Sequence, residues 1–126
     1  MCNKNNSGNC FSELLEKILL LQQTGDNYPL GCDKPFLGNI GLIANTRPVN
    51  LYTCCTGELW EIPYDFNGLI GVSSFFRIES INENCATFRI LIPNGTEYTA
   101  TNNFFIIDLN CIGSIKCLGD TLVQNI

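Results

Sequence analysis

The stretch FFRIESINENCATFRILI, residues 75–92, decides the fold because it contains two strand patterns separated by a turn. Phe76 and Ile78 alternate with Phe75, Arg77 and Glu79, and on the return strand Phe88 and Ile90 alternate with Thr87, Arg89 and Leu91. Alternation with a period of two is typical of a strand that buries one face. The stretch therefore predicts an antiparallel hairpin with one continuous apolar face.

Two registers of this hairpin keep the same face buried. One of them places Arg77 opposite Arg89, which is unfavourable because like charges repel across a ladder. A shift by two residues places Glu79 opposite Arg89 and leaves the faces unchanged. We therefore expect the shifted register, with a longer Asn-rich loop over residues 82–84.

Short apolar runs separated by turn residues continue on both sides of this hairpin. A second hairpin is expected to turn at Pro93-Asn94-Gly95, because Asn and Gly adopt positive φ readily. About seven antiparallel strands predict a mainly β protein, with a single β-sandwich or small barrel over residues 25–126. The expected strands are 41–45, 49–55, 59–62, 72–81, 85–92, 96–101 and 104–111, resuming at 115–118.

One helix is expected ahead of the strands, over residues 12–24. Ser12 can cap its first turn, and Glu13 and Glu16 suit the positive end of the helix dipole. The helical spacing leaves two alternatives open: the helix lies in a groove of its own domain, or one face meets a neighbouring subunit. The residues with that spacing are Phe11, Leu14, Leu15, Ile18 and Gln22, and Leu19, Leu20 and Leu21 extend the apolar surface.

Cysteine is abundant for a domain with its own core, which would ordinarily indicate secretion. Residues 1–10 nevertheless lack the apolar run of a signal peptide, and FSELLEKILLLQQ is too short and too charged to cross a bilayer. We therefore expect synthesis in a reducing compartment, followed by metal binding or by later oxidation. The eight residues are Cys2, Cys10, Cys32, Cys54, Cys55, Cys85, Cys111 and Cys117.

Metal is the weaker of these alternatives. The sequence contains no histidine and no C-x-x-C pair, so the cysteines do not form the ligand clusters of a structural zinc site. We expect no metal and no cofactor, and oxidation to disulfides remains. Cys2 and Cys10 lie in an arm, residues 1–11, that offers little to bury, so we expect a flexible arm whose thiols join subunits.

The other thiols differ in what their positions allow. Cys54 and Cys55 are neighbours in an expected strand and point to opposite faces, so they should not pair with each other. Cys85 begins a strand beside a loop and should be reachable. Cys111 and Cys117 leave an intrachain bridge, an inert core thiol and a link to a neighbour equally open. Cys32, in a turn-rich stretch, is open in the same way.

Charge and composition narrow the classes of function. The net charge of −5 and the pI near 4.5 argue against nucleic acid, which requires a basic patch. Without histidine the usual general base near neutral pH is absent, and no phosphate loop or nucleophile elbow occurs, so we expect no enzymatic activity. Asparagine takes the place of many charged residues, so copies of the chain repel each other weakly and self-packing is favoured.

Several motifs together resemble the CotY/CotZ spore-coat family, which includes the exosporium protein ExsY. They are PFLG (35–38), ANTRP (44–48) with LYT (51–53), FFRIES followed by CATFRIL, and DLNCIGSIKCLGD (108–120). The resemblance implies a structural protein of the spore surface, made in the mother-cell cytoplasm without a signal peptide. It also implies assembly with itself and with other coat proteins into ordered sheets, often of hexamers, that disulfides lock, with no nucleic acid or membrane partner.

The chain departs from the family pattern at Gly113 and near Gly71, where cysteines are expected, so one bridge of the family is hypothesised to be lost as a pair. A binding module that anchors another coat or filament protein, or an adhesive ligand, is the main alternative function. Aromatic residues would form the site of such a module, because aromatics anchor interfaces, although core packing is their more ordinary role. A third possible class is a thiol-redox or metal-storage protein. The aromatic candidates are Tyr52, Trp60, Tyr64 and Phe66.

Overall fold

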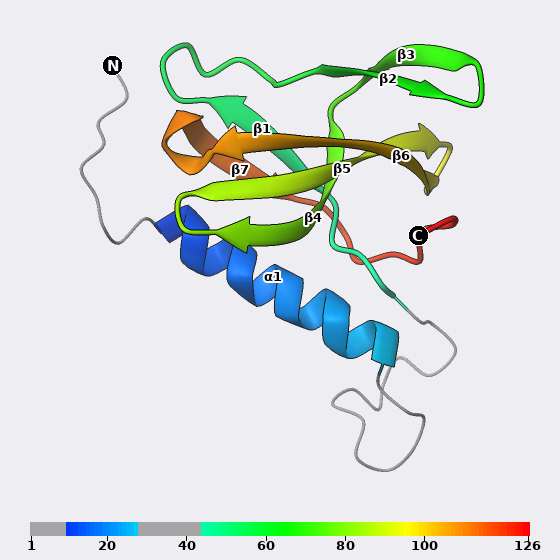
Figure 1. The fold of residues 1–126 in the computed structure, drawn as a ribbon, viewed down its shortest axis with the longest axis horizontal. Coiled ribbons are helices and arrows are strands. Elements are labelled where there is room, and N and C mark those ends of the chain that lie inside the picture. The colour runs from blue at the N-terminus through cyan, green and yellow to red at the C-terminus, as the bar shows by residue number, and fades with distance from the viewer. Residues whose placement is uncertain (1–9, 28–43) are drawn as a thin grey trace.

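The computed structural model describes residues 10–27 and 44–126. The described residues form one α-helix, seven strands and a short 3-10 turn (Figure 1). Cys2, Cys32, PFLG and most of the arm lie outside this part of the chain. The elements are α1 (Cys10–Asn27), β1 (Val49–Thr53), β2 (Ile62–Phe66), β3 (Leu69–Ser73), β4 (Phe75–Asn82), β5 (Cys85–Asn94), β6 (Glu97–Asp108), η1 (Leu109–Cys111) and β7 (Ile112–Cys117).

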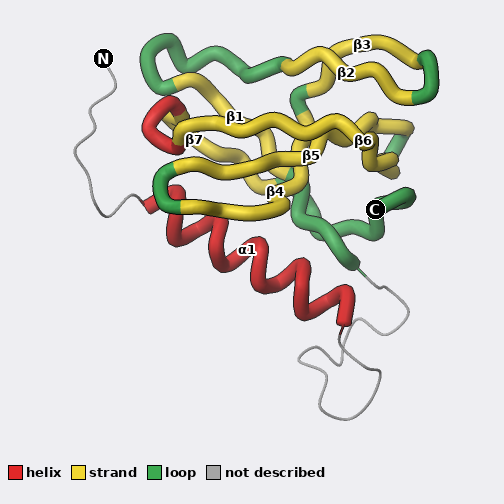
Figure 2. The backbone as a smooth tube through the Cα atoms, viewed as in Figure 1, coloured by secondary structure: helices red, strands yellow, loops and turns green. Residues whose placement is uncertain are grey.

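The strands lie in two antiparallel sheets (Figure 2). The larger sheet has the order β6-β5-β4-β1-β7, and β2 and β3 form a separate two-stranded sheet. The expected mainly β fold of about seven antiparallel strands with an N-terminal helix is thereby confirmed. Of the two architectures considered, the closed barrel does not form among the described strands.

The register of the β4–β5 hairpin differs from the one we expected. Arg77 lies directly opposite Arg89, in the register that the repulsion argument rejected. A bulge between Ile78 and Ser80 removes Glu79 from the ladder, so one carboxylate can reach both guanidinium groups. The expected shift is wrong because the carboxylate compensates the like-charge pair locally and the direct register can be kept.

Within three of the hairpins, a turn of two residues joins the paired strands. Asn82 pairs with Cys85, so the β4–β5 loop is shorter than the Asn-rich loop we expected. Asn94 pairs with Glu97, and Gly95 takes φ +67° in the expected turn, which is confirmed. The third turn, Asn67-Gly68, joins β2 to β3 and has φ +55° and +85°, the values that a type I′ turn requires.

Several strand boundaries also differ from expectation. The strand expected at 59–62 is shifted into β2, and the strand expected at 72–81 is divided between β3 and β4. Most of the runs 96–101 and 104–111 belongs to one long β6 with a bulge opposite β5, residues 109–111 form η1 instead, and the final strand begins at Ile112. Ala44 and Asn45 are not in a strand, and the rest of the run 41–45 lies outside the described residues.

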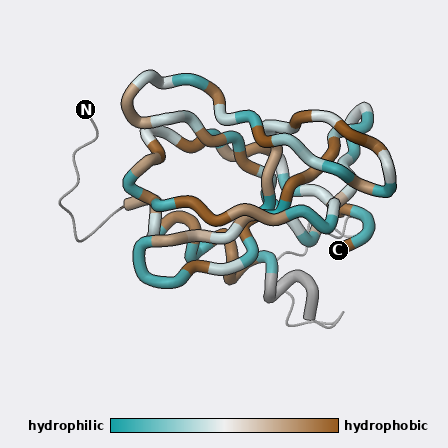
Figure 3. Tube along the Cα trace, turned by 45° about the horizontal axis from the view of Figure 1, so that its top comes forward, coloured by the Kyte–Doolittle hydropathy of each residue, from teal (hydrophilic) through white to brown (hydrophobic). Residues whose placement is uncertain are grey.

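The core lies between α1 and the larger sheet, as the position of α1 beneath β4 shows (Figure 1). Leu15 and Ile18 of α1 are buried against Phe76, Ile78 and Phe88. The apolar face predicted from the hairpin is therefore the face that receives the helix. The hydropathy of the trace changes repeatedly between hydrophobic and hydrophilic along the strands (Figure 3).

The helix is longer than the expected range 12–24. It begins at Cys10, so Ser12 lies inside the first turn and is not its cap, and Cys10 belongs to the helix and not to the arm. One face packs into the chain's own domain, as the first alternative required. Leu20 and Leu21 remain 63% and 52% exposed, so the helix also carries apolar surface that the described residues do not cover.

Candidate functional site

The residues that carry the family resemblance meet in one polar network. Arg77, from FFRIES, is only 5% exposed and donates from Nε to Thr46 Oγ1 at 2.8 Å. Its Nη2 donates to the carbonyl oxygen of Asn45 at 3.1 Å. A buried guanidinium requires such partners because desolvation of an unpaired charge is costly. The ANTRP segment is thus attached to the centre of the sheet.

Glu79 is the anionic centre of the network. Its Oε2 lies 2.8 Å from Arg77 Nη1 and 3.1 Å from Arg89 Nε. The guanidinium carbon of Arg89 also lies 4.6 Å from the ring centroid of Phe104, a cation–π distance. One carboxylate and one aromatic ring therefore stabilise two cations that face each other across the ladder.

A bidentate ion pair attaches the C-terminal segment to the same region. Arg47 Nε lies 2.6 Å from Asp120 Oδ1, and Arg47 Nη2 donates to Asp120 Oδ2 at 2.8 Å. The hydrogen bond to Asp120 raises the pKa of Arg47 above its ordinary value. The side chains are 34% and 47% exposed, so the pair contributes modestly to stability and mainly fixes geometry.

Gln22 connects the helix to this network. It is 3% exposed, and its Nε2 donates to the carbonyl oxygen of Ile78 at 2.9 Å. Its Oε1 accepts from the backbone N–H of Arg47 at 3.2 Å. The network therefore joins the helix, the central strand and the C-terminal segment. Its role is structural, because each of these hydrogen bonds holds one element of the fold against another.

The cysteines form the second group of candidate residues. Cys54 and Cys55 lie in the turn after β1, not in a strand as expected, and their sulfur atoms are 3.9 Å apart. That distance exceeds the disulfide bond length of about 2.05 Å, so they are not bonded to each other. The backbone N–H of Cys54 donates to the carbonyl oxygen of Cys111 at 3.0 Å, which places this turn beside η1.

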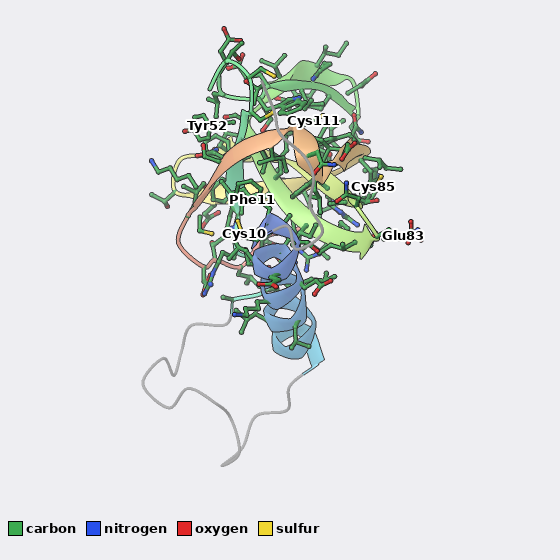
Figure 4. The ribbon with its side chains drawn as sticks, turned by 90° about the vertical axis from the view of Figure 1, so that its left-hand side faces the viewer. Cys10, Phe11, Tyr52, Glu83, Cys85 and Cys111 are labelled. Carbon is green, nitrogen blue, oxygen red and sulfur yellow. The ribbon has the colours of Figure 1, made fainter. Side chains whose placement is uncertain are left out.

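Cys85 lies at the same end of the sheet. It is the ladder partner of Asp108, the residue just before η1, and Leu109 N–H donates to the Asn84 carbonyl at 2.9 Å. Viewed from this end, Figure 4 shows Cys85 and Cys111 above the start of α1, where Cys10 lies. We call this face, with Cys10, Cys85 and Cys111, the thiol end.

Cys117 lies away from the thiol end. It is the last residue of β7, whereas Cys111 precedes the first, and a strand of six residues spans about 20 Å. A disulfide requires Cα atoms within about 7 Å, so these two cysteines cannot bridge each other here. Cys10, Cys85, Cys111 and Cys117 all carry exposed free thiols, and neither Cys111 nor Cys117 is a core thiol.

The aromatic residues considered for a binding site have a different environment. Trp60 and Tyr64 are partly buried and pack against the main core. Tyr64 also covers Gly71, where an added Cβ would lie 2.8 Å from its hydroxyl oxygen. Tyr52 and Phe66 are half-buried as well. The surroundings of Trp60 and Tyr64 are therefore those of ordinary core packing.

Sequence reasoning missed the exposed apolar residues of β3. Leu69, Ile70 and Val72 are 56%, 74% and 60% exposed. A signal for them was present, because Asn67-Gly68 followed by a short apolar run is typical of a hairpin with a type I′ turn. The described residues contain no group of three or more potential metal ligands and no helix long and apolar enough to span a membrane.

Comparison with protein families gives the class of protein. A family model described as Spore coat protein Z matches residues 1–103, so the class is that of spore coat proteins. The curated Spore coat protein Z of Bacillus subtilis (strain 168) is 25% identical over 142 aligned positions, which cover 94% of each chain. The chain belongs to the spore coat protein Z family, and the resemblance to the CotY/CotZ family is confirmed. No solved structure matches it.

Family membership supports a structural role in the spore coat and a location at the spore surface.

Proposed function

We propose that this protein is a self-assembling subunit of the spore coat or exosporium, made in the mother-cell cytoplasm. Its copies associate into ordered arrays, with a hexameric ring or sheet as the expected form, and bind other coat proteins. Disulfides between copies then lock the array. Neither catalysis nor a cofactor is part of this function.

The observation that carries the proposal is the clustering of exposed thiols at one end of the molecule. Cys10, Cys85 and Cys111 come from three different elements, and each carries a free thiol. An isolated soluble subunit gains nothing from exposed thiols, which oxidise and cross-link. A coat subunit benefits, because a bridge between chains prevents subunit loss until it is reduced.

The chemistry follows from the same positions. Formation of a bridge joins the sulfur atoms of two thiols and removes two protons and two electrons, which an external oxidant such as a small-molecule disulfide accepts. Synthesis in a reducing compartment keeps the thiols free, and exposure to oxidant after assembly then links copies that are already in contact.

The test uses a mixture of isotope-labelled and unlabelled full-length protein, assembled under reductant and then oxidised with glutathione disulfide. We expect a ladder of multimers on nonreducing gels that collapses with reductant, and ordered rings or sheets by electron microscopy. Peptide mapping should find mixed-isotope bridges, which can form only between chains. Oxidised monomers whose bridges all carry a single isotope label would contradict the proposal.

Variants then separate the arm from the thiol end. Replacing Cys2 and Cys10 with Ser should leave the domain folded but make oxidised assemblies sensitive to heat or denaturant. Replacing Cys85 and Cys111 with Ser tests the remainder of the thiol end in the same assay. If the first variant forms multimers as resistant as wild type, the arm and the helix start are not cross-linking points.

A further inference from the structure

β3 has an unpaired outer edge. Phe66 and Leu69 close the two-residue turn as a hydrogen-bonded pair, so the N–H and C=O groups of Ile70 and Val72 point away from β2. The pairing of Val72 with Pro63 agrees, since proline has no N–H to give to the ladder. Among the described residues no strand pairs with this edge, which lies at the upper margin of Figure 1.

The other edge of the same hairpin is closed. Asp65 N–H donates to Asn103 Oδ1 at 2.8 Å, and Asn103 Nδ2 donates to the Asp65 carbonyl at 3.1 Å. A side-chain amide from β6 therefore occupies the position that a neighbouring strand would take. The hairpin can be extended only through β3.

β3 lacks the features that usually protect an edge strand. Proteins block such edges with charges, proline, bulges or covering segments, because an exposed flat apolar edge is a template for another strand. The strand Leu69–Ser73 has no charge and no proline, and its pairing with β2 contains no bulge. In a chain of net charge −5, this neutral strand is a place where two copies can approach with little repulsion.

We propose that two copies of this chain pair antiparallel through β3, giving a continuous four-stranded sheet β2-β3-β3-β2. In the register centred on Gly71, Ile70 of each copy lies opposite Val72 of the other, and the two residues exchange N–H and C=O groups. Gly71 then faces its own copy in a non-hydrogen-bonded pair, where backbones approach to about 4.5 Å and the absence of a Cβ is an advantage.

The strand that pairs with β3 is β3 of a second copy, because the outer edge of this strand is complementary to itself. In this register every outward donor faces an acceptor, and every outward apolar side chain of the central pairs faces another. The arrangement has two-fold symmetry, so it closes on itself as an isologous dimer contact. The proposal rests on the proposed self-assembly and identifies one of its noncovalent contacts, which involves no cysteine.

The test is sedimentation equilibrium of the full chain in reductant, so that no disulfide can form. We expect the average mass of wild type to rise above 14.0 kDa with concentration. Ile70→Lys should raise the dissociation constant at least about tenfold, since two-fold symmetry introduces the charge twice at a paired edge. Ile106→Lys is the matched control, because Ile106 is 71% exposed on β6, and it should associate as wild type.

A measurement on wild type needs no substitution. Hydrogen exchange at the Ile70 and Val72 amides should slow as protein concentration rises, while exchange at exposed loop amides stays constant. Protection that is independent of concentration would mean that another segment of the same chain covers β3, and would overturn the inference. So would a wild type that stays at 14.0 kDa, or an Ile70→Lys variant that is folded by circular dichroism and associates unchanged.

Failure here is distinguishable from failure of the proposed function. An Ile70→Lys variant that associates as wild type in reductant and forms mixed-isotope disulfide ladders after oxidation would remove the β3 contact and leave the proposed self-assembly and cross-linking intact. Loss of association in Ile106→Lys but not in Ile70→Lys would place the contact at β6, and the β3 inference would be wrong.

Discussion

Arg77 and Arg89 lie directly opposite each other in the β4–β5 ladder, and both contact the same oxygen of Glu79. Glu79 can do so because the bulge takes it out of the alternation that would otherwise pair it with β5. An arrangement that a pairwise rule marks as unfavourable is thereby stabilised by a residue two positions away.

Glu79→Gln should destabilise the domain by about 2–3 kcal/mol. Removing one partner of a buried ion pair costs about 3–5 kcal/mol, and the 21% exposure of the Glu79 side chain reduces that figure. The free energy of unfolding in urea is the measurement. Glu97→Gln, at an exposed position, should change it little, and equal stability of the two variants would contradict the account. Adding Arg89→Met to Glu79→Gln should restore part of the loss.

Gln22→Leu should cost about 1–3 kcal/mol, the penalty for leaving buried polar groups without partners. Leucine has a similar size but cannot accept from Arg47 N–H or donate to the Ile78 carbonyl. Thermal unfolding measures the effect, and Leu21→Gln, on the exposed side of the helix, is the control. A Gln22→Leu variant more stable than wild type would show that the helix is held by its apolar face alone.

Gly113→Ala should destabilise by about 1–3 kcal/mol, as overpacking typically does. An added Cβ would lie 2.6 Å from the Cys54 Cα and 2.7 Å from the Thr53 oxygen, which are backbone atoms that cannot turn aside. Gly119→Ala is the control, since nothing lies within 4 Å of its added Cβ. Equal stabilities of the Gly113→Ala and Gly119→Ala variants would mean that the turn after β1 can move to accommodate the added Cβ at little cost.

The same geometry bears on the hypothesis of a lost bridge. A cysteine at position 113 would require the chain around Cys54 to move, because any residue other than glycine carries a Cβ. In this chain, then, restoring a cysteine there by substitution should lower stability as Gly113→Ala does, whatever pairing it allows. Urea unfolding of Gly113→Cys in reductant measures that cost.

Asn103→Ala should release the β2–β3 hairpin without unfolding the domain. A two-stranded sheet is marginal by itself, and Asn103 supplies both hydrogen bonds to the Asp65 backbone. We expect faster hydrogen exchange at the Asp65 amide and a global loss of about 1 kcal/mol. Asn102→Ala, at the exposed neighbouring position, should leave that amide unchanged. Unaltered exchange in Asn103→Ala would show that the side chain does not hold the hairpin.

Much of the fold follows from local patterns in the sequence. The alternation around Phe76 and Phe88 predicts the buried face correctly, because burial of one face imposes a period of two. The positions of Leu15 and Ile18 predict the helix face for the corresponding reason. The capping side chain of Ser12 predicts a start at that residue, whereas the helix begins two residues earlier, at Cys10.

The candidate site is less predictable. The register depends on Glu79 leaving the ladder, and a bulge has no reliable local signal. The gathering of Cys10, Cys85 and Cys111 depends on how distant strands end beside one another, which spacing alone does not encode. The β2–β3 hairpin is different: Asn67-Gly68 is a strong turn signal, but the expected strands leave residues 69–71 unassigned and join Val72 and Ser73 to the next strand.

The thiol end has a consequence for the accuracy of assembly. Cys85 lies between its ladder partners Asn82 and Asp108, and the carbonyl oxygen of Cys111 accepts from the backbone N–H of Cys54, so the backbone that carries each of these two residues is held in place. Because a disulfide tolerates only a narrow range of separations and torsions, a neighbour seated in the wrong orientation presents no sulfur at bonding distance. In the proposed array, oxidation would therefore link only correctly oriented neighbours covalently, and misplaced copies could still dissociate.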